Sequence, residues 1–392
     1  MKTFFLPLMY ICISISLNAQ SLADPLLIAI EGNNTRLKAL RLQAESQKLD
    51  NKTNIYLQAP EGEFGYLWGN TADHSNRIDI HISQTFDIPT LSGMKGRLSD
   101  RQNNSVDWQY RISRMEILLH AKQIVIELSY LNQRKNEMEV RLLHAQLLAQ
   151  ALTKQFESGY ANRLDHNKAY LNLAKVQNEL SKILLERQFA QAQLIRLNGG
   201  HEIDWHETDY PMQHLPDTPD EWMAENFHKD PRLVYSTQEV EISKENIHLQ
   251  KANRWPVFSV GYASEKVGAE HFQGAIAGIH IPLWENKNQI TKAKTIALAA
   301  QANQIDLQQQ YQSMMVSLFT KVAGLQSIAN SYAEAMKTTY NIELLDKALQ
   351  AGEISVLTYL TELSAFYELN DLVMEAERDF QLALAELLAV EL

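Results

Sequence analysis

The sequence predicts a mostly α-helical fold with a β-barrel part, arranged as an internal tandem repeat along 392 residues. Three observations predict this fold class. Long tracts lack both glycine and proline, four short segments alternate apolar with polar residues, and the same landmarks return at a nearly constant offset in the second half. A chain of this length could form two or three compact domains, but the three patterns together indicate one elongated molecule.

The tracts without glycine or proline predict very long helices. They cover residues 97–158, 160–198 and 353–392, and the tract 283–351 contains Gly324 as its single glycine. Strong helix formers dominate them, and apolar residues recur at spacings of three and four. A helix of about 60 residues would be roughly 90 Å long, so we expect coiled-coil packing rather than a globular core.

Four segments predict membrane β-strands. Residues 78–88 alternate between apolar and polar side chains over about 11 positions, the length of a tilted membrane strand. Similar alternation occurs at 64–68, 258–262 and 274–281. A half-buried sheet in a soluble protein is the alternative. Aromatic residues lie near the strand ends, as in an interfacial girdle: Tyr66, Trp68, Trp255, Tyr262 and Trp284.

Four membrane strands cannot close a barrel alone, because no water satisfies the backbone groups of an unpaired edge in hydrocarbon. Known barrels begin at about eight strands. Several chains must therefore share one barrel. Two chains would supply eight strands and three chains twelve, and the residue pattern leaves both open. The polar positions expected to line the lumen are Asp79, His81, Asp87 and His280.

The tandem repeat sets the expected organisation of the chain. Pro282 lies 193 positions after Pro89, and Gly352 lies 193 positions after Gly159. Each half is predicted to contain a helix, a strand pair, a long helix, a tight turn and a final helix. The predicted divisions are a first repeat at 20–200 with its strand pair at 62–89, a linker at 201–230, and a second repeat at 231–392 with its strand pair at 256–282.

Residues 1–19 are predicted to be a secretory signal peptide. Lys2 precedes the apolar segment 4–17, which is too short for a membrane helix, and Ala19 occupies a plausible cleavage site. Cys12, the one cysteine, lies inside this segment, so the mature chain would have no disulfide and no thiolate ligand. No later run of about 18 apolar residues occurs, which excludes a helical membrane protein.

The charge and the motifs argue against several function classes. A net charge of −11 disfavours nucleic-acid binding. We find no nucleophile elbow, phosphate loop, HExxH or dinucleotide-binding glycine motif, so no catalytic residue and no cofactor are predicted. Three histidines in the linker, His201, His206 and His214, are loosely spaced without a cysteine, and we predict no metal site there.

Short motifs in order along the chain resemble the TolC-like outer-membrane efflux protein family. ISQTFDIP (82–89) resembles the exit of a strand into the family's first long helix. RWPVFSVGY (254–262) and GIHIPLW (278–284) resemble the strand entry and exit of its second half, while FESG (156–159) and LQAG (349–352) resemble its two hairpin turns. Each motif is weak alone, but their order and shared offset cover nearly the whole mature chain.

The resemblance implies a homotrimer in the outer membrane of a Gram-negative bacterium. It would combine a 12-stranded barrel, in contact with outer-membrane lipid, with a long α-helical coiled-coil tunnel through the periplasm. The implied function is passive conduction in tripartite efflux or type I secretion. The implied partners are a periplasmic adaptor and an inner-membrane pump such as an RND-type transporter. Such ducts carry metal cations, drugs or proteins. The alternative, a soluble periplasmic coiled-coil adaptor or scaffold, lacks the two strand pairs.

The resemblance also assigns roles at the two hairpin tips. It implies that the tips contact the adaptor and that the helix after the second tip lines the pore entrance. Some family members carry acidic residues six and nine positions past this turn, where this chain departs from the pattern with Thr358 and Thr361. The expected contact residues are Gly159, Tyr160, Leu164, Gly352, Ile354 and Leu357, and the expected entrance residues are Thr358, Thr361, Glu362 and Asp371.

Overall fold

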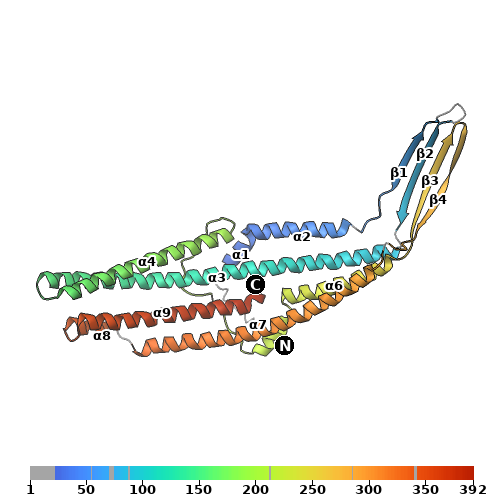
Figure 1. Cartoon of the computed structure of the whole chain (residues 1–392). Coiled ribbons are helices and arrows are strands. Elements are labelled where there is room, and N and C mark those ends of the chain that lie inside the picture. The colour runs from blue at the N-terminus through green and yellow to red at the C-terminus, as the bar shows by residue number, and fades with distance from the viewer. Residues whose placement is uncertain are drawn as a thin grey trace, which may run out of the picture.

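A computed structural model of the chain describes residues 23–53, 55–69, 75–86, 89–211, 213–284, 286–339 and 342–392. The predicted signal peptide, Cys12 and Asp87 lie outside the described residues. Long helices lie side by side along one axis, and a four-stranded sheet extends from one end of them (Figure 1). None of the helices in the described part of the chain is both long and apolar enough to cross a membrane.

The longest helices confirm the expectation from the glycine- and proline-free tracts. Helix α3 covers Pro89–Glu157 with 69 residues, and α7 covers Gln289–Thr339 with 51 residues. At 1.5 Å per residue α3 is roughly 100 Å long. The remaining helices are α1 (Ala23–Asn33), α2 (Thr35–Thr53), α4 (Arg163–Leu197), α5 (Pro219–Phe227), α6 (Pro231–Ala252), α8 (Ile342–Gln350) and α9 (Val356–Leu387), followed by the 3₁₀ helix η1 (Leu388–Glu391).

Two helical tracts differ from the sequence expectation. The first helix is divided at Asn34, whose buried side chain accepts from the backbone N–H of Leu37 (2.9 Å) and donates to the carbonyl of Leu197 (2.7 Å). A long-range bond to α4 therefore accompanies the division between α1 and α2. The tract expected to be one long helix before the second turn contains two helices, because α8 begins anew at Ile342 and packs along α9 (Figure 1).

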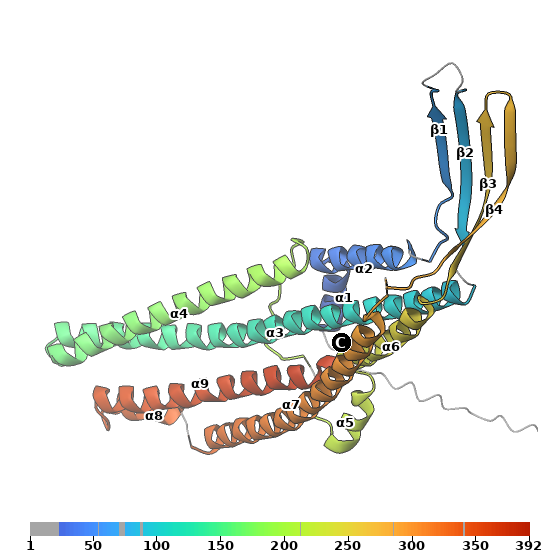
Figure 2. The same ribbon diagram turned by 45° about the vertical axis from the view of Figure 1, so that its right-hand side comes forward.

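The sheet is antiparallel and combines the two halves of the chain. Its strands are β1 (Glu61–Leu67), β2 (Arg77–Phe86), β3 (Val257–Val267) and β4 (Glu270–His280), in the spatial order β1-β2-β3-β4. Strands β2 and β3 pair along their whole length from Phe86↔Phe258 to Arg77↔Val267. The sheet is not closed, as expected for a single chain, and both outer strands are visible as free edges (Figure 2).

The helices form a layer in which α3 is central. Along the half of its length that is farther from the sheet, α3 packs against α4 and α9, and along the nearer half it packs against α2 and α6 (Figure 1). Helix α7 packs against α6 and α9, which places α2 and α4 along one lateral edge and α7 along the other. Apolar cores around Leu128 and Leu194 and around Val322 and Leu384 stabilise this layer.

Candidate functional site

The sheet has one apolar face and one polar face. Residues opposite each other in antiparallel strands share a face, and Ile80, Ile82 and Phe86 alternate with Asp79 and His81 along β2. Side chains on both faces are at least partly accessible to solvent. The register places these residues on the apolar face: Phe64, Tyr66, Ile78, Ile80, Ile82, Phe86, Phe258, Val260, Tyr262, Ala275, Ala277 and Ile279.

Three of the predicted lumen residues share the polar face. His81 lies opposite Ala263, Asp79 lies opposite Glu265, and His280 lies opposite Val257 on the same side. Arg77 joins them through Nε, 2.9 Å from Asp79 Oδ1 and 3.3 Å from Glu265 Oε1. Most of the charged side chains of the sheet therefore lie on this face, whereas Lys266 and His271 lie on the other face, at the end where β3 and β4 are joined.

The two hairpin turns have the same backbone construction. Gly159 and Gly352 both have a positive φ, +77° and +74°. The N–H of Tyr160 donates to the carbonyl of Gln155, and the N–H of Glu353 donates to that of Ala348. This six-residue closure, with glycine in the left-handed conformation, is the Schellman motif. The side chains of Asn162 and Ser355 then cap the following helices at Asp165 N and Thr358 N.

The predicted contact residues project from these tips to different extents. Tyr160 is 88% exposed and Leu164 62%, while Leu357 is 53% exposed and Ile354 is half-buried. Val356 packs against the small cluster of Ala149, Leu152 and Ala169 in the first hairpin. An apolar contact therefore holds the two tips together within one chain. Of the predicted entrance residues, Thr358, Thr361 and Glu362 are exposed.

Asp371, the fourth predicted entrance residue, is engaged by arginines from α3. Arg141 is 5% exposed and donates from Nη2 to Asp371 Oδ1 (2.6 Å) and from Nη1 to Oδ2 (3.1 Å). Arg134 forms a second ion pair with the same carboxylate. The guanidinium of Arg141 also lies over the ring of Tyr367, 4.3 Å from its centroid. This cluster links the first hairpin to α9.

The electrostatics of this cluster follow from burial and pairing. Burial disfavours the charge on Arg141, but hydrogen bonds to Asp371 and Glu137 raise its pKa above the ordinary value. Burial raises the pKa of Tyr367 to about 12, and its hydroxyl lies 3.0 Å from Nδ1 of His144. The sequence did not identify Arg141. A usable signal existed, because Arg134 and Arg141 are seven positions apart and flank the buried Met138.

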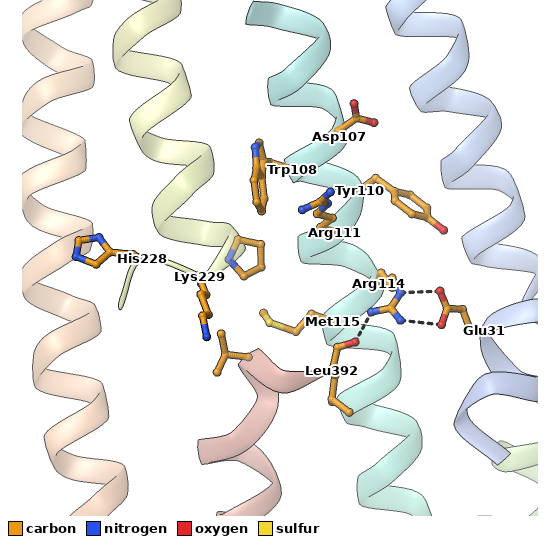
Figure 3. Close-up of a pocket in the computed structure, with 12 residues that line it drawn as sticks. Glu31, Asp107, Trp108, Tyr110, Arg111, Arg114, Met115, His228, Lys229 and Leu392 are labelled. Carbon is orange, nitrogen blue, oxygen red and sulfur yellow. Dashed lines mark hydrogen bonds and ion pairs between the residues drawn. The ribbon is translucent and has the colours of Figure 1, made fainter. Parts of the chain in front are cut away.

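A pocket of about 670 Å³ is lined by residues of α1 and α3, the start of α6 and the residues that follow α9 (Figure 3). Arg114 of α3 lines this pocket and connects α3 to α1. Its Nε and Nη2 donate to the two carboxylate oxygens of Glu31 (2.6 and 2.7 Å). The same guanidinium donates to the carbonyl of Leu392, so it joins α1, α3 and the C-terminal residue. Arg111 stacks over Trp108, 4.3 Å from the ring centroid.

The linker histidines do not gather in the structure. Nε2 of His206 lies 2.8 Å from Oδ2 of Asp204, and both side chains are largely exposed. Within the described ranges, no group of three or more histidine, cysteine, aspartate or glutamate residues is arranged to hold a metal ion. The extended segment near them is fixed to α3 by side-chain bonds, since Asn132 donates to the carbonyls of Trp205 and Glu207.

Solved outer-membrane channels share this fold. The outer-membrane channel OprN aligns with a TM-score of 0.76 and 15% identity, covering 93% of this chain and 88% of that chain. The outer membrane protein VceC of Vibrio cholerae aligns at 0.75 and 13%, covering 93% and 95%. The MtrE outer membrane channel of Neisseria gonorrhoeae aligns at 0.69 and 13%, covering 93% and 88%. No family model and no curated protein matches the sequence. The predicted resemblance is thus confirmed at the level of the fold.

Proposed function

We propose that this chain, whose fold is that of the solved outer-membrane channels, is one protomer of a trimeric exit duct in the outer membrane of a Gram-negative bacterium. It would conduct substrate passively from a periplasmic adaptor and an inner-membrane pump, such as an RND-type transporter, and would have no catalytic function. The observation that carries this proposal is the open four-stranded sheet with one apolar and one polar face.

The apolar face suits contact with lipid, and the polar face suits a water-filled lumen. Each unsatisfied backbone group in hydrocarbon costs several kcal/mol, so the free edges of β1 and β4 need strand partners. Three copies would provide twelve strands, a size seen in closed barrels. In such a barrel Asp79, His81 and His280 would line the interior, with three copies of each.

The length of the helices and their exposed tips also support this proposal. A helix of roughly 100 Å can reach far from the membrane into the periplasm. The end of the helical part away from the sheet carries the two glycine turns, with the exposed side chains of Tyr160, Leu164 and Leu357 (Figure 1). We propose that these tips, with Gly159, Gly352 and Ile354, contact the adaptor. The helix after the second tip, with Thr358, Thr361, Glu362 and Asp371, would form the entrance to the pore.

The decisive experiment is the mass of the purified mature protein, measured by light scattering with and without detergent, followed by conductance in planar bilayers. We expect a species of three chains that requires detergent and conducts ions. A monomer that is soluble without detergent would overturn the proposal and favour a periplasmic coiled-coil adaptor or scaffold.

A matched pair of variants tests which face of the sheet meets lipid. Ile82 and His81 are neighbours in β2 on opposite faces. A lysine on the lipid face near the middle of the bilayer costs about 2–4 kcal/mol, whereas lumen positions tolerate charge. Ile82→Lys should therefore reduce the amount of protein in the outer membrane, and His81→Lys should not. Equal yields of both variants would contradict the assignment of the faces.

A further inference from the structure

The linker and α5 lie on one face of the helical layer. Ser129 of α3 donates a hydrogen bond to the carbonyl of Asp209 in the linker (3.2 Å). Arg187 of α4 donates to the carbonyl of Trp205, also in the linker (3.4 Å). On α7, the ring of Phe319 packs edge-to-face with a tryptophan of α5, with 5.6 Å between the centroids. Each of these three helices therefore turns one side toward the linker or α5.

The opposite side of the same helices is uncovered within the part of the chain that the structure describes. Two positions along an α-helix correspond to a rotation of about 200°. Glu127 of α3, Leu185 and Phe189 of α4 and Lys321 of α7 each lie two positions from the residue of the same helix that contacts the linker or α5. These four side chains therefore belong to the other face of the layer.

Two cavities adjoin on this uncovered face. One of about 490 Å³ lies between α3, α7 and α9, and the other, of about 440 Å³, lies between α3 and α4. Ile124 and Glu127 line both cavities, so the two form one groove across the layer. Its volume suits an organic molecule of drug size, for which sites of about 300–1,000 Å³ are usual. The apolar lining consists of Ile124, Leu131, Leu185, Phe189, Ala190, Leu325, Leu382 and Ala383.

The polar lining of this groove is mainly acidic. Lys321 is its one lysine, His120 also lines it, and the carboxylates that line it come from three helices: Glu127, Glu186, Asp379 and Glu386. Burial raises the pKa of Glu127 above its ordinary value, and among the described residues no side chain donates a hydrogen bond to its carboxylate. A cation placed beside Glu127 would therefore compensate a partly desolvated charge.

In the proposed duct the uncovered face turns inward. Three copies of the row α4-α3-α9-α7 would supply twelve helices. Helices about 10 Å apart close into a ring with a radius of roughly 19 Å at their axes, which leaves an open radius of roughly 14 Å. A linker and α5 placed inside would fill about 10 Å of that radius. The linker therefore suits the outer surface, and the groove suits the wall of the lumen.

We propose that this groove binds lipophilic organic cations, with the apolar side chains contacting the hydrocarbon surface of the ligand and Glu127 its charge. The inference rests on the proposed duct and deepens it, because it assigns a substrate class to a site on the lumen wall. Phe189 is 68% exposed, so its ring is available for a cation–π contact. An anion of the same shape would be repelled by the four carboxylates.

Equilibrium dialysis of the mature protein in nonionic detergent tests this groove. The probe is tetraphenylphosphonium, tetraphenylborate is an anion of the same shape, and detergent without protein is the blank. We expect saturable binding of the cation and none of the anion. Glu127→Gln should weaken the binding several-fold. Glu377→Gln is the control, because it removes the same charge from the side of α9 that interacts with Asp209 of the linker, two positions from Asp379.

A second pair of variants tests the apolar part of the groove. Phe189→Ala should weaken the binding of tetraphenylphosphonium several-fold, because it removes an exposed ring that lines the groove. Leu184→Ala is its control. Leu184 is 43% exposed and lies three positions from Arg187, about 60° around the helix, so it belongs to the side of α4 that faces the linker.

The outcomes separate this inference from the proposed duct. A trimer that conducts but binds both ions equally, or binds the cation as well in Glu127→Gln as in Glu377→Gln, would overturn the groove and leave the duct intact. Binding that depends on Glu127 in a protein without a trimer or conductance would support the groove and overturn the duct. In planar bilayers tetraphenylphosphonium should reduce the current, and less so in Glu127→Gln. Binding with no change in current would overturn the placement on the lumen wall.

Discussion

The two helical hairpins use the same turn but differ in what surrounds it. Gly159 and Gly352 close equivalent Schellman motifs, and Asn162 and Ser355 cap the helices that follow. The first turn ends the uninterrupted helix α3, whereas the second is preceded by the nine-residue helix α8, a separate element from α7. The same local turn therefore follows one long helix in the first hairpin and a separate short helix in the second.

The surfaces of the hairpins also differ in charge. Residues 150–175 of the first contain four lysines or arginines and two acidic residues, and residues 342–368 of the second contain one lysine and five acidic residues. The two surfaces are joined by Val356 at the tips and by Arg141 and Asp371 further along. Equivalent turns therefore present unlike surfaces, and the following experiments test which features each hairpin needs.

The largest expected effect is a loss of efflux. Leu357→Arg places a charge on the exposed tip of the second hairpin, where we propose adaptor contact, and it should abolish efflux while the trimer remains intact. Leu164→Arg makes the equivalent change in the first hairpin and shows whether both tips are needed. Efflux is measured in cells, and light scattering measures the mass of the trimer. Leu357→Met preserves an apolar side chain of similar volume and should retain efflux. Normal efflux by both arginine variants would remove the contact role of the tips.

Arg141→Ala should weaken the attachment of the first hairpin to α9, because it removes one partner of a buried ion pair. Loss of such a partner typically destabilises by about 3 kcal/mol or more, and the remaining Arg134 pair keeps the expected loss near that lower value. The measurement is the midpoint of urea unfolding. Lys135→Ala is the control on the same helix, because its pair with Glu139 is solvent-exposed and should contribute less than about 1 kcal/mol. Equal midpoints for the two variants would show that the cluster does not hold the hairpins together.

Replacing Gly159 or Gly352 with valine should lower the free energy of unfolding by a similar amount in the two hairpins. Left-handed backbone disfavours a residue with a Cβ atom by about 1–2 kcal/mol, and φ is positive at Gly159 and Gly352 alike. Thermal unfolding of Gly159→Val and Gly352→Val measures this cost. Gly324→Ala lies within α7 with open space around its Cβ, and it should stabilise by up to about 1 kcal/mol. A large difference between the two valine variants would refute the equivalence of the turns.

The smallest effect is expected on acidification, far from both hairpins. The hydrogen bonds from Arg114 lower the pKa of Glu31 below its ordinary value of 4.5. The stabilisation contributed by the ionised Glu31 carboxylate is therefore fully present above about pH 4.5. It is lost as the pH falls through the lower pKa that Glu31 has in the folded state. Proteolysis between α1 and α2 measures loosening of this joint. In the Glu31→Gln variant, the rate of proteolysis between α1 and α2 should no longer increase as the pH falls, while the helicity of the hairpins stays unchanged.

Local residue patterns were sufficient to predict much of this molecule. Alternation at 78–88 located β2, and Pro89 and Gly159 located the two ends of α3. In the second half Pro282 and Gly352 enclose both α7 (Gln289–Thr339) and α8 (Ile342–Gln350). The polar positions Asp79, His81 and His280 could be placed on one face, because successive residues of a strand point to opposite sides. The turns at Gly159 and Gly352 could also be predicted locally, because the left-handed backbone conformation of a tight turn favours glycine.

The sequence by itself determined the strands, the long helices and the turns, because their signals are periodicity and backbone preference within a few neighbouring residues. Tertiary structure alone decided the division at Asn34, the separate helix α8 and the attachment of Asp371 to Arg141. The first and the last of these depend on groups far apart in the chain: Asn34 bonds to Leu197, and Arg141 bonds to a carboxylate 230 positions away. Periodicity shows that Arg141 belongs to a packed stripe of α3, but its partner is set by which helix lies beside that stripe.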